Sequence, residues 1–250
     1  MPAAFDRVDI DHRPWPMPAS PWFWRQSWHD LLFAHWPVPG SAVRHLVPDW
    51  LAVDEFDGST WVGLVPFRMT NVTLRGVPPV PFFSRFPEMN LRLYVERDGR
   101  PGIWFVSLDA SRQAAVIAAR NFAHLPYFHS TMTCEARGDD IAYSSVRRGD
   151  ERVAFAATYG PTGPILASAP GSLDHFLTER YCLYTQDSRG RRLRMDIHHD
   201  RWPLQPAHAD ITTNRVADLQ GIALPDTAPV LHFSRRIDVV GWRFESVGTR

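Results

Sequence analysis

Residues 101–136 constrain the fold of this chain most, because they combine a strand, a helix and a second strand in one segment. Its first part is apolar and rich in β-favouring residues. Asp109 is suited to cap a helix through its carboxylate, and small and apolar residues recur at helical spacing over residues 110–122. Pro126 ends this helix, because proline offers no N–H and restrains the residue before it. The segment therefore predicts strand, helix and strand in succession.

The second strand of this segment has two different faces. Residues of the first face are mostly polar, and those of the second are mostly apolar: Tyr127, His129, Thr131 and Thr133 against Phe128, Met132 and Cys134. We interpret the apolar face as core and the polar face as the wall of a candidate site. A histidine on a strand is more often structural than catalytic, although beside a tyrosine it can also transfer protons near neutral pH.

The N-terminal part of the chain is rich in proline. Residues 1–21 are expected to form an extended arm, and residues 22–250 a single domain, since no break in composition divides them. Ser20 followed by Pro21 is typical of a helix start, and an aromatic stripe predicts that this helix continues to about Trp36.

Short strands and tight turns dominate the rest of the sequence. A short helix is expected at residues 173–179, with Ser172 as its cap. Strands are expected at residues 51–54, 60–70, 82–97, 140–148, 152–159, 181–187, 191–199, 207–213 and 231–240. Many strands with about three helices indicate a β-rich, mostly antiparallel α+β domain.

Composition excludes several classes of function. The formal net charge is +0, which argues against a general binder of nucleic acid or of anionic membranes. No apolar run approaches the ~20 residues that span a bilayer, and the first residues lack the features of a signal peptide, so we expect a cytoplasmic protein. The two cysteines, Cys134 and Cys182, do not form a disulfide framework.

The chain contains no lysine, because all 27 of its basic Lys and Arg residues are arginine. Lysine is the residue that forms Schiff bases with carbonyl substrates and with pyridoxal phosphate, so neither can form on a lysine here. A phosphate-binding loop of the Walker type is excluded for the same reason. We therefore expect no cofactor. Codon bias in a GC-rich genome accounts for the missing lysine equally well.

The strand that follows Pro87 alternates cleanly. Its polar face carries Glu88, Asn90, Arg92 and Tyr94, and its other face carries Met89, Leu91, Leu93 and Val95. Such alternation usually separates core from solvent. It also occurs where polar residues line the inside of a closed sheet. A carboxyl group, an amide, a guanidinium group and a phenol in one row are able to hold an acid and orient a carbonyl group, which favours the second interpretation.

Two other features carry weaker signals. His198 and His199 suggest a zinc site, but neighbouring residues on a strand lie on opposite faces and do not readily share one metal ion. We therefore expect no metal site. Arg120, on the predicted helix, is either a solvated residue or one that binds a carboxylate.

Several segments of the sequence together resemble the bacterial YqjF-like family, a domain of unknown function. They include Phe-Pro-Glu-Met-Asn-Leu-Arg-Leu-Tyr-Val at residues 86–95, and the others lie at residues 28–39, 61–69, 102–110, 125–127, 171–181 and 198–204. The family is grouped with the acetoacetate decarboxylase-like fold. The resemblance implies a cone-like barrel of curled sheets around a small-molecule pocket.

The same resemblance suggests a changed site. In the decarboxylases a Gly-Arg pair is followed by Pro-Lys, and that lysine forms the Schiff base. Here Ala119-Arg120 is followed at the same spacing by Pro126-Tyr127, so a tyrosine stands where the catalytic lysine would be. The glutamate of the decarboxylase pocket corresponds to Glu88. The resemblance thus implies a similar pocket with different chemistry.

Three functions remain open at this point. The first is a small-molecule-binding protein for a keto or aromatic acid, with Glu88, Asn90, Arg92, Tyr127 and His129 in its pocket. The second is a lyase- or decarboxylase-type enzyme that uses non-covalent acid–base catalysis, with Glu88 or His129 as base, Tyr127 as donor, and Arg92 or Arg120 binding the carboxylate. The third is a structural protein whose tryptophans form an interface, and a homo-oligomer is compatible with each of them.

Overall fold

The structure is a computed structural model that describes residues 10–78 and 84–248. Its strands are β1 (Trp24–Val38), β2 (Ala52–Val53), β3 (Thr60–Leu74), β4 (Phe86–Arg97), β5 (Arg100–Ala110), β6 (Tyr127–Arg137), β7 (Asp140–Arg147), β8 (Ala154–Pro161), β9 (Cys182–Gln186), β10 (Arg192–His198), β11 (Gln205–Asn214), β12 (Val230–Gly241) and β13 (Glu245–Ser246). Its α-helices are α1 (Gly40–Val43), α2 (Gln113–Ala118) and α3 (Leu173–Thr178). Short 3₁₀ turns lie at Arg44–Leu46 and Asp218–Gln220, and a π-helical turn lies at Ala119–Ala123.

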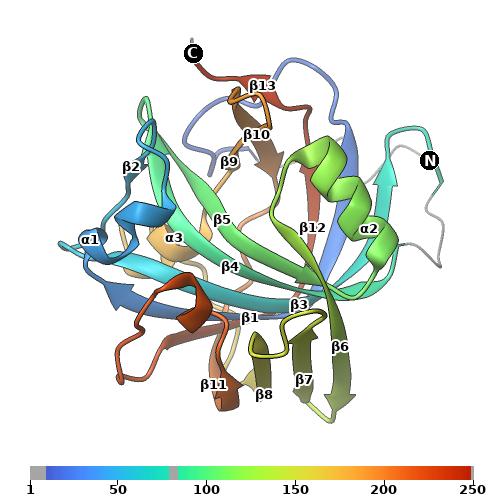
Figure 1. Ribbon diagram of the computed structural model, residues 1–250, viewed down its shortest axis with the longest axis vertical. Coiled ribbons are helices and arrows are strands. Elements are labelled where there is room, and N and C mark those ends of the chain that lie inside the picture. Colours follow the sequence, from blue (N-terminus) through green and yellow to red (C-terminus); the bar gives the residue numbers. More distant parts are fainter. Residues whose placement is uncertain (1–9, 79–83, 249–250) are drawn as a thin grey trace.

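The strands form one curled sheet in the order β13-β10-β9-β5-β6-β7-β8-β11-β12-β1-β3-β4-β2. Additional pairings between β4 and β5 and between β10 and β12 bring distant parts of this order together (Figure 1). Every pairing is antiparallel except those of β5 with β6 and of β5 with β9. The expected β-rich, mostly antiparallel α+β fold with curled sheets and few helices is confirmed.

The curl gives β1, β3 and β4 two covered faces. One face packs against β7 and β8 in the largest apolar cluster, which contains Leu64, Leu91, Tyr143 and Phe155. The opposite face, which we call the inner face, carries Phe33, Phe67 and Glu88. It is covered by β9, β10, β12, α3 and the loop around Trp202. We call the layer of side chains between this face and its cover the inner compartment.

The helix expected to begin at Pro21 and to end at about Trp36 is wrong, because this segment contains the long strand β1. Leu31, Leu32, Phe33 and Ala34 are all buried, since β1 is covered on both faces, and a strand of this kind lacks the alternation that identifies it. A bulge at Asp30, whose φ is +53°, shifts the register between β1 and β3 and disturbs the pattern further.

The expected strand, helix and strand over residues 101–136 are present as β5, α2 and β6. Leu108 pairs with Tyr127 and Ala110 with His129 in a parallel register, so the helix connects two neighbouring parallel strands. Asp109 is not the helix cap: it lies inside β5, and α2 begins four residues later at Gln113. The expected cap of the later helix is confirmed, because Ser172 Oγ accepts a hydrogen bond from His175 N at 3.2 Å.

The described part of the arm has no helix or strand over residues 10–23, and residues 1–9 lie outside the described residues. His12 and Arg13 are nonetheless buried against β10. His12 Nε2 lies 2.9 Å from the carbonyl oxygen of His199, and Arg13 donates to the carbonyl oxygen of Ile197 at 2.6 Å. Among the described residues, no helix has the length and apolar character required to span a membrane.

Candidate functional site

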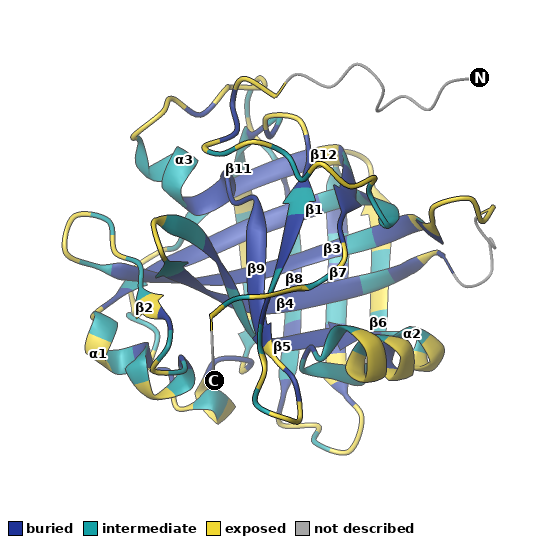
Figure 2. Cartoon of the chain, turned by 90° about the horizontal axis from the view of Figure 1, so that it is seen from above, coloured by how far each residue is buried: buried dark blue, intermediate teal, exposed yellow. Residues whose placement is uncertain are grey.

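The polar face of β4 lies inside the molecule. Glu88, Asn90, Arg92 and Tyr94 are 2%, 8%, 9% and 0% exposed, and Figure 2 shows β4 and its neighbour β3 as mostly buried strands. The register explains this placement. Glu88 lies opposite Phe67 and Ala110, and Asn90 lies opposite Val65 and Leu108, which are apolar residues of the inner face. The polar residues of β4 therefore do not face solvent.

Glu88 and Tyr127 are in direct contact. The Tyr127 hydroxyl donates a hydrogen bond to Glu88 Oε2 at 3.0 Å, from β6 across the intervening strand β5. Burial raises the pKa of Glu88 to about 8, although the hydrogen bond from Tyr127 lowers it and the charge of Asp109 raises it further. Burial also raises the pKa of Tyr127 well above its ordinary value. At pH 7 the pair is therefore a largely neutral carboxylic acid beside a neutral phenol.

Arg92 is a buried cation without a counter-ion. Its guanidinium group donates to the carbonyl oxygen of Leu177 at 2.8 Å and to the Tyr94 hydroxyl at 3.1 Å, and it lies over the ring of Phe33. No carboxylate forms an ion pair with it among the described residues. An unpaired charge in a protein interior is costly, so this group is suited to an anion.

Gly63 makes room for this guanidinium group. A Cβ atom at position 63 would lie 3.0 Å from Arg92 Cγ, 3.1 Å from its Nε and 3.1 Å from His35 Cδ2. His35 Nε2 lies 2.7 Å from the Tyr94 hydroxyl, and burial together with the charge of Arg92 lowers the pKa of His35 well below its ordinary value. His35 is therefore neutral beside the arginine.

Many polar atoms of the inner compartment have no hydrogen-bond partner among the described residues. Buried polar atoms are nearly always paired, so a cluster of unpaired ones indicates a place for water or a polar ligand. They are Asn90 Oδ1, Arg92 Nε, His35 Nδ1, His232 Nδ1, Ser234 Oγ and Trp202 Nε1.

An aromatic wall lies among these polar atoms. Trp202 packs edge-on against Phe33 at a ring distance of 4.8 Å and stacks on Trp28 at 5.9 Å. Trp28 in turn lies 5.6 Å from Phe67, which is opposite Glu88 in the sheet. The compartment thus combines a cation, neutral donors and flat apolar surfaces.

The other expected site residues lie differently. His129 is on the inner face beside Ala110, but its side chain forms no hydrogen bond or ion pair among the described residues. Arg120 is exposed on the π-helical turn, where its Nε donates to the carbonyl oxygen of Tyr127 at 2.5 Å and its guanidinium group lies over Phe128. The structure therefore brings Glu88 and Tyr127 together and places Arg120 on the surface side of β6.

Sequence reasoning missed three residues of the compartment. His35 and His232 lie on β1 and β12, and Trp202 lies on the loop after β10. The signal for His35 was present, because Leu31, Phe33 and His35 follow the period of a strand, but the segment was interpreted as a helix. Nothing in the sequence relates His232 or Trp202 to β4.

A buried ion pair on the other side of β5 holds β6 and β7 in place. Asp109 is 1% exposed and accepts hydrogen bonds from Arg147 Nε at 2.9 Å, from Arg147 NH2 at 2.7 Å and from Ser130 Oγ at 2.6 Å. Arg147 also lies 3.8 Å over the ring of Phe128, next to Tyr127. This ion pair therefore fixes the strand that presents Tyr127 to Glu88.

Replacing Asp109 by asparagine is expected to lower the free energy of unfolding by about 3–5 kcal/mol, because Arg147 becomes a buried cation without a partner. Urea denaturation measures the change. The double variant Asp109→Asn, Arg147→Met is the control and is expected to recover most of the loss. A loss below about 1 kcal/mol in the single variant would show that the pair is not structural.

His198 and His199 are both buried, at 1% exposure each. His199 stacks on Tyr181 at a ring distance of 4.7 Å, and burial lowers its pKa. No group of three or more His, Cys, Asp or Glu side chains able to hold a metal ion occurs in the described part of the chain.

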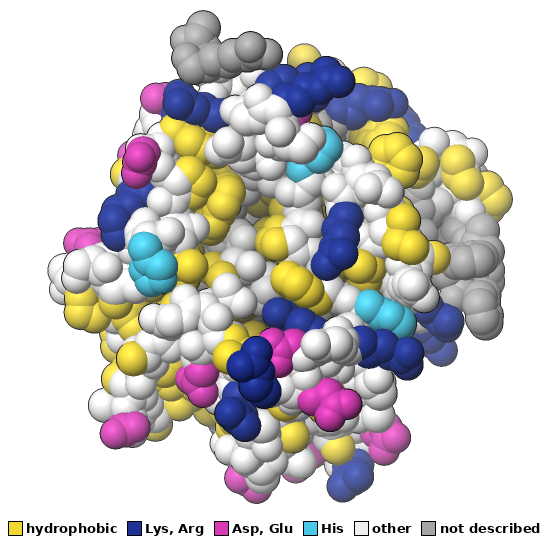
Figure 3. Space-filling model, in the orientation of Figure 1, with side chains coloured by type: hydrophobic (Ala, Val, Ile, Leu, Met, Phe, Trp, Pro, Cys, Tyr) yellow, Lys and Arg dark blue, Asp and Glu magenta, His cyan; other side chains and the backbone are white. Residues whose placement is uncertain are grey.

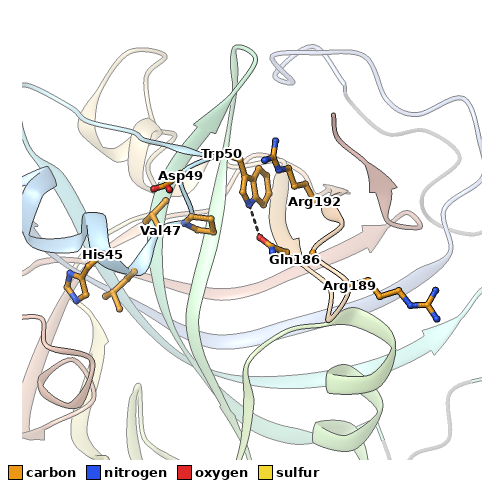
Figure 4. A pocket seen from close by; sticks show the side chains of 10 residues that line it. His45, Val47, Asp49, Trp50, Gln186, Arg189 and Arg192 are labelled. Carbon is orange, nitrogen blue, oxygen red and sulfur yellow. Dashed lines mark hydrogen bonds between the residues drawn. The ribbon is translucent and has the colours of Figure 1, made fainter. Parts of the chain in front are cut away.

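Two surface grooves lie apart from the Glu88–Tyr127 pair. The first has a volume of about 740 Å³ and is lined by His45, Trp50, Gln186, Arg189 and Arg192 among others (Figure 4). The second, of about 500 Å³, is lined by residues of β5, of β9 and of the segment 120–126. Of the expected site residues, only Arg120 lines either groove.

Solved structures with the same architecture show the fold of this protein. An acetoacetate decarboxylase structure matches with a TM-score of 0.61 and 15% identity, over 92% of this chain and 90% of the other. The acetoacetate decarboxylase of Legionella pneumophila matches with a TM-score of 0.63 and 12% identity, over 96% of this chain and 93% of the other. The enduracididine biosynthesis enzyme MppR, complexed with pyruvate, matches with a TM-score of 0.64 and 12% identity, over 92% of this chain and 91% of the other. The chain has the acetoacetate decarboxylase-like fold.

The sequence comparisons are more specific. The model of the DUF2071 family of uncharacterised conserved proteins matches residues 25–238. The uncharacterised protein YqjF of Bacillus subtilis (strain 168) is 46% identical over 226 residues, which are 90% of this chain and 93% of that protein. The chain therefore belongs to the DUF2071 family, and the resemblance to YqjF-like proteins is confirmed.

Proposed function

We propose that this protein binds a small organic acid in the inner compartment, with the carboxylate of the acid at Arg92. The observation that carries the proposal is the buried guanidinium group of Arg92, which has no carboxylate partner among the described residues and has an unpaired Nε. A bound carboxylate would neutralise this charge and accept the free N–H. Fork-like pairing of this kind is the strongest hydrogen bonding that arginine forms.

The opposite end of the compartment suits an oxygen atom of the same ligand. Protonated Glu88 donates its O–H to a carbonyl or hydroxyl oxygen of the ligand, while it accepts the single O–H of the Tyr127 phenol. Glu88 and Arg92 are four positions apart on one strand, which corresponds to roughly 13 Å between their Cα atoms. Together with the wall of Trp28, Phe33 and Trp202, this spacing favours an aromatic acid over a shorter keto acid.

The fold is compatible with this proposal but does not decide it. One protein of the same fold is described as complexed with pyruvate, and others are acetoacetate decarboxylases. Their identity to this chain is 12–15%, so the likeness concerns the fold. Because the chain contains no lysine, it cannot catalyse a reaction through a Schiff base on one of its own lysines.

A second candidate function rests on the pKa of Glu88, which is raised to about 8 by burial. A carboxyl group that titrates near the working pH is suited to general acid–base catalysis. In this candidate Glu88 exchanges a proton with a carbonyl acid, while Tyr127 donates to the developing oxyanion and Arg92 binds the carboxylate. His129 lies on the same face of the sheet as an alternative base.

Calorimetric titration with benzoate, 4-hydroxybenzoate, phenylpyruvate and pyruvate tests the proposal. We expect the aromatic acids to bind at least tenfold more tightly than pyruvate and than benzyl alcohol, a neutral analogue of benzoate that lacks the carboxylate. Binding of benzyl alcohol as tight as that of benzoate would contradict the proposal. NMR spectra of the same mixtures detect turnover of the acids. If the second candidate function is correct, turnover is expected in the wild-type protein and is expected to disappear in Glu88→Gln and in Tyr127→Phe.

A further inference from the structure

The wall of the inner compartment has a notch where two strands diverge from β5. On this edge of β5, Ile103 and Trp104 pair with β9, and residues 108–110 pair with β6. In the described part of the chain no strand pairs with residues 105–107 on this edge, although Phe105 and Ser107 pair with β4 on the other edge. The second surface groove, of about 500 Å³, lies at this notch.

Residues of both faces of the sheet line this groove. Trp104, Val106 and Tyr184 pack in the outer apolar cluster, whereas Phe105 and Leu125 belong to the cluster of the inner compartment. Tyr127 packs against that same inner cluster, and Phe105 lies opposite Arg92 in the register of β4 and β5. Side chains rather than a hydrogen-bonded strand therefore separate the groove from the proposed ligand site.

The segment that borders the notch has an irregular backbone. The α2 helix is six residues long and continues into the π-helical turn, after which His124 has a φ of +52°. A non-glycine residue in this left-handed conformation is strained, and π-helical turns are frequent at functional sites. Thr185 Oγ1 donates to the carbonyl oxygen of His124 at 2.6 Å and links this segment to β9.

Positive charge gathers along the approach to the notch. The linings of the two grooves have Leu46 and Gln186 in common, so the grooves lie next to each other. Their lining includes Arg120, Arg189 and Arg192, which form no ion pair among the described residues, and Asp49 is the acidic residue of the lining. Figure 3 shows the face of Figure 1 hollowed near its centre, with basic side chains around the hollow, and Figure 4 shows Arg192 above Gln186 and Arg189 to its right.

We propose that the notch between β6 and β9 is the entrance to the inner compartment and that an organic anion first binds the arginines of the two grooves before it passes Phe105 and Leu125. This inference rests on the proposed function. It adds the route of the ligand and the residues that determine its rate of binding. Attraction by a positively charged groove raises association rates tenfold or more and weakens with salt.

Stopped-flow fluorescence with 1-anilinonaphthalene-8-sulfonate, an aromatic anion, tests the route. The signal of interest is the part that benzoate displaces. In Gln186→Cys the new thiol lies where the two grooves meet, and coupling it to N-ethylmaleimide is expected to slow association at least tenfold. Burial raises the pKa values of Cys134 and Cys182 to about 12, and the wild-type protein treated with N-ethylmaleimide is the control for modification of these native thiols. Glu151→Cys, in the exposed turn between β7 and β8, is the modified control and is expected to bind at the wild-type rate.

Arg120→Gln supplies a second measurement. We expect its association rate to fall three- to tenfold at low salt and to approach the wild-type rate at high salt, because the screened charge no longer attracts the anion. Arg152→Gln removes the same charge at an exposed site remote from the grooves and is expected to leave the rate unchanged.

The outcomes separate the two proposals. Absence of any benzoate-displaceable signal in the wild-type protein overturns the proposed function and the entrance with it. Displaceable binding whose rate is unaffected by modified Gln186→Cys and by Arg120→Gln overturns the entrance alone. Slower association in both, with the controls unchanged, supports the entrance.

Discussion

Replacement of Arg92 by methionine is expected to weaken binding of an aromatic acid at least 100-fold while leaving the free energy of unfolding unchanged or higher. The guanidinium group is buried without a carboxylate partner, so the folded state pays the free-energy cost of removing a charge from water. Replacing arginine by methionine removes this cost. The substitution also leaves no acceptor unpaired, because the carbonyl oxygen of Leu177 still accepts from Tyr94 and the Tyr94 hydroxyl still contacts His35. Methionine fills the same space as the aliphatic part of arginine.

Calorimetry and urea denaturation on the same samples measure the two effects. Arg147→Met is the matched control, since Arg147 is buried to a similar degree but is paired with Asp109. That variant is expected to lose about 3–5 kcal/mol, because a carboxylate is left buried without its partner. If Arg92→Met loses as much stability as Arg147→Met, Arg92 is structural and the proposed binding role is wrong.

Replacement of Glu88 by glutamine is expected to stabilise the protein increasingly as pH rises from 5 to 8. Burial raises the pKa of Glu88 from 4.5 to about 8 in the folded state. Between these values the folded protein holds a proton that the unfolded chain has released, so the stability of the wild type falls as pH rises through this range. Glutamine resembles the protonated acid, still accepts the hydrogen bond from Tyr127, and does not titrate.

The expected difference follows from the size of the shift. At pH 5 the two proteins should differ little, and by pH 8 the glutamine variant should be more stable by several kcal/mol, with an upper limit of roughly 5 kcal/mol. Urea denaturation at pH 5, 6, 7 and 8 measures this difference. Glu135→Gln, on the exposed part of β6, is the control for the loss of one carboxyl group. A stability difference that stays constant with pH would mean that Glu88 is ionised in the folded protein.

The fold was largely predictable because most of its strands alternate between polar and apolar residues. The strand β1 was missed because residues 31–34 are apolar and buried on both faces, so this part of its sequence has no period of two. The parallel pair β5 and β6 was predictable from the helix between them. The position of Asp109 was not, because a carboxylate that caps a helix and one that pairs with a distant arginine have the same local sequence.

The candidate site was predictable only in part. The row on β4 and the residue at position 127 could be chosen from alternation and from the family resemblance, and the structure places Glu88 against Tyr127. Whether the row was buried could not be decided, since polar residues that face solvent and polar residues that face an enclosed compartment alternate alike. His35, His232 and Trp202 join the compartment from segments far apart in sequence, and only the curl of the sheet relates them.

The glycine at position 63 has a consequence for the evolution of this fold. Because even one methyl group there would require Arg92 and His35 to shift by a few tenths of an ångström, a relative with a larger residue at this position has to hold its cationic group in a different position. A single column of a sequence alignment would then divide these proteins into lineages with different ligands. The smallest residue in the neighbourhood would be the most informative marker of what each lineage recognises.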